Sequence, residues 1–114
     1  MCLESCATAM SDLYPAKCPI GRTLNLIGER WAIMILRDLT LIGPRKFSDF
    51  ERAFPRLGVN TLSARLKALE ESGLIARRLY SDHPPRAEYA LTPKGETLRP
   101  VLRALKDWGL AHGK

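Results

Sequence analysis

The strongest constraint on the fold of this chain is a leucine repeat in its middle that is closed by a glycine. Leu62, Leu66 and Leu69 fall at positions i, i+4 and i+7, which places them on one face of a helix. Gly73 follows the repeat, and glycine commonly ends a helix because it accepts left-handed backbone angles. We therefore predict a helix over residues 59–72, with its leucines in a core and a polar face opposite them.

Two short segments after this helix predict a β-hairpin. Residues 74–80 are rich in apolar side chains and indicate a strand, and residues 87–91 indicate the returning strand. Between them, residues 81–86 contain Pro84-Pro85 and are expected to form the loop.

Three more helices are predicted before the leucine repeat. A short helix at 19–27 is followed by an almost wholly apolar helix at 29–42, which indicates a buried, central element. A third, short helix is expected to start at Ser48, because Ser48 and Glu51 have the spacing of a capping box. It should end by Phe54, which precedes a proline.

A last helix is predicted from Thr92-Pro93, because threonine caps a helix and proline suits its first turn. We expect one continuous helix over 93–112, about 30 Å long by helical rise. Its apolar side exceeds what a core of this size needs, so we expect a two-fold dimer unless the stripe packs only within its own chain. The expected interface residues are Ile20, Leu24, Leu98, Val101, Leu102, Leu105 and Trp108.

The order of these elements predicts the fold class. Two helices joined by a short turn and followed by a hairpin form a winged helix-turn-helix, a mainly α fold with a small β-hairpin. We expect one such domain at 18–114, with dimerisation helices at its two ends, after a flexible lead-in at 1–17.

Four motifs in this order resemble the HxlR family of winged helix-turn-helix regulators, and the resemblance covers about residues 18–109. The motifs are Cys18-Pro19 with Gly28-Glu29-Arg30-Trp31, Phe47-Ser48-Asp49-Phe50, Leu62-Ser63-Ala64-Arg65-Leu66 with Leu69-Glu70-Glu71-Ser72-Gly73-Leu74, and Pro84-Pro85-Arg86-Ala87-Glu88-Tyr89-Ala90-Leu91-Thr92. One departure is Glu29-Arg30, where many members have glycine and lysine. We expect this departure to alter helix capping rather than function.

The resemblance implies a homodimeric transcription regulator that binds inverted-repeat operators in double-stranded DNA. Some members sense electrophiles or oxidants through the cysteine of the Cys-Pro pair, which is Cys18 here. Cys18 starts a helix, where backbone N–H groups with Lys17 and Arg22 can stabilise a thiolate, but it could equally be a small core residue. Cys2 and Cys6 are candidate resolving thiols.

The outer face of the predicted helix at 59–72 supplies the candidate base-reading residues. An asparagine suits adenine, serine and threonine hydroxyls bond several base edges, an alanine methyl can touch thymine, and a lysine can meet guanine or phosphate. The base-reading candidates are Asn60, Thr61, Ser63, Ala64 and Lys67.

Basic residues around this helix are candidates for contacts with the DNA backbone. Arg86 could reach the minor groove from the hairpin, unless it pairs locally with Glu88. Arg65 lies beside the leucine stripe, so it is either a flanking phosphate contact or an intramolecular one. The full backbone set is Arg45, Lys46, Arg56, Arg65, His83 and Arg86.

Composition agrees with a DNA partner and disfavours other classes. The net charge is +6, and residues 45–91 carry nine positive and six negative side chains while residues 92–114 carry five and two. We find no phosphate-binding glycine loop, nucleophile elbow or HExxH motif, so we expect neither an enzyme nor a cofactor. The three cysteines favour neither a disulfide framework nor a metal site.

The absence of a long apolar run or a secretory signal predicts a cytoplasmic protein with no membrane contact. Two alternatives remain open at this point. One is a winged helix that binds proteins instead of DNA, and the other is a regulator that responds to a small ligand without a redox role.

Overall fold

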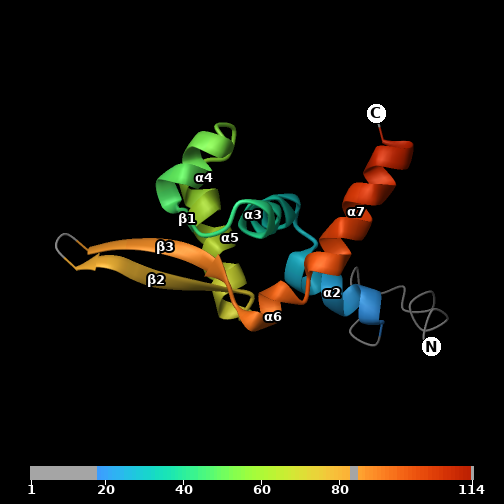
Figure 1. Cartoon of the computed structure of the whole chain (residues 1–114), viewed down its shortest axis with the longest axis horizontal. Helices are drawn as coiled ribbons and strands as arrows, with labels where there is room; N and C mark the ends of the chain where they lie inside the picture. Colours follow the sequence, from blue (N-terminus) through green and yellow to red (C-terminus); the bar gives the residue numbers. More distant parts are fainter. Residues whose placement is uncertain (1–17, 83–84, 114) are drawn as a thin grey trace.

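The computed structural model describes residues 18–82 and 85–113. In chain order its elements are α2 (Pro19–Ile27), α3 (Arg30–Leu41), β1 (Arg45–Lys46), α4 (Phe47–Ala53), α5 (Val59–Glu71), β2 (Ile75–Asp82), β3 (Pro85–Leu91), α6 (Pro93–Glu96) and α7 (Arg99–His112). Helices α3, α4 and α5 form a central body, from which the β2–β3 hairpin projects on one side and α7 on the other (Figure 1). The predicted fold class, a mainly helical winged helix-turn-helix, is confirmed.

The core lies where α3, α4 and α5 meet the base of the hairpin. Leu62, Leu66 and Leu69 are all at most 1% exposed, as the leucine repeat predicts. Phe50 of α4 is fully buried, and its ring centroid lies 6.4 Å from that of Phe54 and 6.4 Å from that of Tyr89. The α5 helix is thus fixed by one buried stripe, which leaves its opposite side exposed.

The three strands form one antiparallel sheet in the order β1-β3-β2. The hairpin is longer than predicted, because β2 runs to Asp82 and β3 starts at Pro85. The prediction of a loop over 81–86 is therefore wrong for residues 81–82 and 85–86, while residues 83–84 lie outside the described part of the chain. Pro85 is the first residue of β3, one of the positions to which proline is confined in sheets. A register shift between Leu79 and Ser81 accommodates the longer pairing.

Helix α4 starts one residue before the predicted Ser48. The backbone N–H of Lys46 donates to Asp49 Oδ2 at 2.9 Å, so Asp49 and not Glu51 closes the first turn. This register places the side chain of Phe47 against the core. The hydrogen bond from Lys46, helped by the charges of two nearby arginines, holds the pKa of Asp49 below its usual value.

The predicted single helix over 93–112 is in fact two helices, α6 and α7. Pro100 has no N–H to donate to the carbonyl of Glu96, so the helical hydrogen bonds are interrupted there. The intervening turn is tighter, because Leu98 N donates to Gly95 O at 3.0 Å, three residues back. The expected cap is present, since Gly95 N donates to Thr92 Oγ1 at 3.0 Å.

Glu29, one of the two residues that depart from the family pattern, caps α3. Its carboxylate accepts a hydrogen bond from Ala32 N at 2.9 Å. No helix within residues 18–82 and 85–113 is long and apolar enough to cross a membrane. The expected lead-in at 1–17 lies outside the described residues.

Candidate DNA-binding surface

The side of α5 opposite the buried leucines carries short polar side chains. All five base-reading candidates are exposed, and they cluster in the first three turns of the helix: Asn60, Thr61, Ser63, Ala64 and Lys67. No salt bridge within the described residues engages Lys67. This face therefore offers an amide, two hydroxyls, a methyl and an ammonium group to a partner.

Arg65 borders this face but is turned toward the rest of the chain. Its Nε lies 3.8 Å from the carboxylate of Glu29 at the start of α3. Of the two roles expected for Arg65, the structure contains the intramolecular one.

The hairpin presents Arg86 near its tip with an exposed side chain. Its predicted local partner, Glu88, is instead engaged by Arg78, whose Nε donates to Glu88 Oε2 at 2.9 Å. Among the described residues, Arg86 therefore does not form the ion pair with Glu88 that was the alternative to a DNA contact. His83, another candidate of this group, lies outside the described residues.

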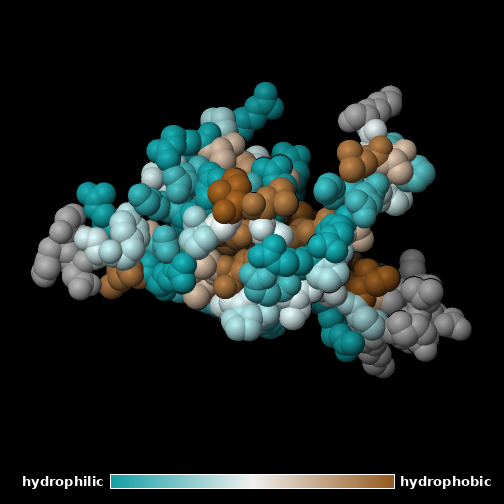
Figure 2. All heavy atoms as spheres, in the orientation of Figure 1, coloured by the Kyte–Doolittle hydropathy of each residue, from teal (hydrophilic) through white to brown (hydrophobic). Residues whose placement is uncertain are grey.

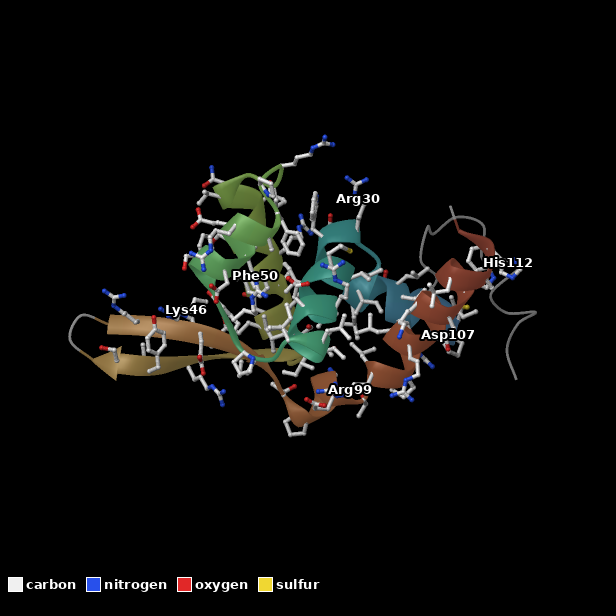
Figure 3. The ribbon with its side chains drawn as sticks, turned by 45° about the horizontal axis from the view of Figure 1, so that its top comes forward. Arg30, Lys46, Phe50, Arg99, Asp107 and His112 are labelled. Carbon is white, nitrogen blue, oxygen red and sulfur yellow. The ribbon has the colours of Figure 1, made fainter. Side chains whose placement is uncertain are left out.

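Lys46 and Arg86 line one hollow between α4 and the hairpin, with a volume of about 360 Å³. The ammonium group of Lys46 lies 5.1 Å from the centroid of the Tyr80 ring, which also lines the hollow. Tyr80 was not among the candidate DNA-binding residues, because in the sequence it is only the last residue of the predicted strand over 74–80. Figure 3 shows Lys46 beside the hairpin, away from the buried ring of Phe50.

Arg45 and Arg56 differ in position although both were candidates for phosphate contacts. Arg45 has a side chain only 15% exposed, which donates to Asp49 O at 3.1 Å and lies 4.0 Å from the buried carboxylate of Asp38. The position of Arg45 is therefore that of a structural residue. Arg56 is exposed in the turn before α5.

The candidate dimer residues separate into two groups. Leu98 and Leu102 are half-buried against the core of their own chain. For these two residues the alternative to a dimer contact, packing within the chain, is the arrangement observed. The others are exposed on α2 and α7: Ile20, Leu24, Val101, Leu105 and Trp108. Figure 2 shows hydrophobic side chains on the surface of α7, none of whose residues is buried.

Cys18 occupies the position before the first residue of α2, as expected, and is 2% exposed. It is disulfide-bonded, and its partner is not among the described residues. The sequence disfavoured a disulfide framework, although it offered Cys2 and Cys6 as candidate resolving thiols for Cys18. The other two cysteines, Cys2 and Cys6, lie outside the described residues. Within the described part of the chain, no three histidine, cysteine or acidic side chains gather as metal ligands.

A family model described as HxlR-like helix-turn-helix matches residues 26–114. The chain belongs to this family. It is 39% identical over 92 residues to the HTH-type transcriptional regulator YdeP of Bacillus subtilis, covering 81% of this chain and 71% of that protein. The HxlR-like chain also shares its fold with solved transcriptional regulators.

Two solved structures of regulators resemble this HxlR-like chain. One is the redox regulator HypR in its oxidised form, with a TM-score of 0.77, 34% identity, and coverage of 83% of this chain and 97% of that one. The other is the reduced form of the transcriptional regulator YodB from B. subtilis, with a TM-score of 0.67, 28% identity, and coverage of 81% and 90%.

Proposed function

We propose that this HxlR-like protein is a sequence-specific regulator that binds an inverted-repeat operator as a homodimer. The observation that carries the proposal is the exposed polar face of α5 opposite three buried leucines. A helix of this kind enters the major groove with its N-terminal residues against base edges. Asn60 is assigned to adenine, Ala64 to a thymine methyl group, and Lys67 to guanine or phosphate.

The apolar stripe on α7 supports dimerisation through the two ends of the domain. Leu105 and Trp108 are 50% and 67% exposed, and they lie on one face of α7 with Val101. Ile20 and Leu24 add exposed apolar surface on α2. A two-fold dimer of these helices would place two α5 helices about one DNA turn apart, roughly 34 Å.

Lys46, Arg56 and Arg86 are assigned to the DNA backbone in this proposal. Lys46 and Arg86 share one hollow between α4 and the hairpin, so both can meet the same strand of DNA.

Replacing Arg86 with alanine tests this assignment. We expect weaker binding to all DNA sequences, and a slope of log affinity against log salt that falls by about 2, one unit from each protomer. The measurement is fluorescence anisotropy with labelled duplexes over a salt series. Lys94→Ala is the matched control, because Lys94 is an exposed cation in α6 that bonds Ser72 O instead of facing the hairpin hollow. An unchanged slope for Arg86→Ala would remove Arg86 from the surface.

We further propose that thiol–disulfide exchange at Cys18 alters operator binding. Cys18 adjoins α2, which carries part of the exposed apolar surface, so opening or closing its disulfide would act beside the dimer contact. The structural similarity to the redox regulator HypR supports this proposal. A reductant opens the bond to two thiols, and diamide closes it again while taking up two electrons and two protons.

The Cys18→Ser variant tests the redox role. We expect operator affinity of the wild-type protein to differ at least threefold between dithiothreitol and diamide, and the variant to show no such difference. Operator binding is measured in both conditions at one salt concentration. Identical responses of the wild type and the variant would refute sensing at Cys18.

A further inference from the structure

A second hollow, distant from the hairpin, lies where the end of α3 meets the start of α7. Its volume is about 210 Å³, below the range typical of pockets for drug-sized ligands. Leu41 and Leu102 give it an apolar wall. A molecule that fits here must be small and partly apolar.

Four cations surround this hollow. Arg37 and Arg99 already have acidic partners, since Arg37 Nη2 lies 2.8 Å from Asp38 Oδ1 and Arg99 pairs with Glu96. Arg103 and Lys106, the other two lining cations, form no ion pair within the described residues. Two positive charges are therefore left without a counter-charge beside a partly apolar hollow, which favours an anion.

Thr40 provides the second observation. It lines the same hollow, and its Oγ1 is buried without a hydrogen-bond partner among the residues that the structure describes. Buried hydroxyls in proteins nearly always have a partner, so the Thr40 hydroxyl keeps an unused hydrogen bond beside the hollow. A carboxylate or phosphate oxygen is an acceptor that the Thr40 hydroxyl can donate to.

The face of α7 that lines the hollow is separate from its exposed apolar stripe. Residues 99, 102, 103 and 106 follow one another at helical spacing, whereas Val101, Leu105 and Trp108 repeat on another side. Asp107 lies one turn beyond Arg103 but makes no ion pair with it in the described structure. Figure 3 shows Arg99 at the start of α7 and Asp107 further along the helix.

We propose that this hollow binds a small organic anion, a carboxylate or phosphate ester with a short apolar part, and that the anion sets the angle of α7. None of the residues of α7 is buried, and the hydrogen bond from Arg99 Nη1 to Thr40 O at 3.0 Å joins its first turn to α3. An anion between Thr40 and the two free cations would clamp α7 to α3. In the proposed dimer, that angle determines the spacing of the two α5 helices.

Calorimetry on the protein alone, with phenyl phosphate and benzoate as probes, tests the site without DNA. We expect at least one anion to bind with a Kd below about 1 mM, and neutral benzyl alcohol not to bind. The Arg103→Gln/Lys106→Gln variant should weaken binding at least tenfold, and Thr40→Val about threefold, because it removes one hydrogen bond. Arg30→Gln is the control, since Arg30 is an exposed cation about 15 Å back along α3 from Thr40. No binding by the wild type, or equal binding by all variants, would overturn the site.

The effect on α7 rests on the proposed DNA-binding function and is measured separately. Saturating phenyl phosphate should change operator affinity at least threefold for the wild type and not for the double variant. If the anion binds but operator affinity stays the same, the role in setting α7 is overturned. If the protein binds no DNA at all, the proposed function fails, while calorimetry still decides the anion site. If the double variant lowers the salt slope of DNA binding and no anion binds, the cations contact DNA and the pocket proposal is wrong.

Discussion

Replacing Leu105 with glutamate is expected to produce a monomer and to weaken operator binding about a hundredfold or more. Leu105 is half-exposed on α7, so the side chain adds little to the core of its own chain. A buried, unpaired carboxylate at a dimer contact is strongly unfavourable. A monomer meets one half-site at a time and loses the gain from linked binding, which is commonly two to four orders of magnitude.

Light scattering and anisotropy on the same samples measure both effects. Leu110→Glu is the matched control, because it makes the same change on α7 at a residue that is 76% exposed and lies off the Val101–Leu105–Trp108 stripe. We expect this control to stay dimeric and to bind normally. A dimeric Leu105→Glu protein with normal affinity would show that α7 does not form the interface.

Replacing Gly95 with alanine is expected to destabilise the fold by about 3 kcal/mol. A Cβ at Gly95 would lie 2.1 Å from the carbonyl oxygen of Leu74, which is backbone at the base of the hairpin and cannot swing away. The same region is fixed by the hydrogen bond from Thr92 N to Leu74 O at 3.1 Å. Relief of the overlap would therefore shift α6 and β2 apart.

Urea unfolding followed by circular dichroism measures this loss. Gly58→Ala is the control, because a Cβ at Gly58 meets no atom within 4 Å and its φ of −67° suits alanine. Its stability should stay within about 1 kcal/mol of the wild type. Equal stability of the two variants would contradict the close packing of α6 against the hairpin.

The helical part of the fold was predictable because buried leucines repeat at a spacing that only a helix explains. Leu62, Leu66 and Leu69 fixed both the helix and the side of it that faces the core. The interruption between α6 and α7 was not predicted, although Pro100 was its signal. The apolar residues on both sides of Pro100 continue a helical pattern, and that pattern conceals a break in the backbone hydrogen bonds.

The candidate DNA-binding surface was predictable where side-chain direction follows from helix geometry. The exposed positions of Asn60 and Lys67 needed only the leucine stripe as a reference. The environment of Arg45 was not predictable, because its contacts with Asp38 and Asp49 depend on how α3, β1 and α4 pack together. The hollow lined by Lys46 and Arg86 was likewise not predictable, because it forms only when β3 pairs with β1.

Selection of bound duplexes from a random DNA pool, with the wild type and Asn60→Ala in parallel, tests the central claim most directly. The account predicts an inverted repeat with half-sites about one helical turn apart for the wild type. It also predicts that the variant loses preference at one base pair in each half-site and keeps the remaining sequence. Enrichment of no sequence by the wild type, or the same base preferences with and without Asn60, would contradict the reading of DNA by the exposed face of α5.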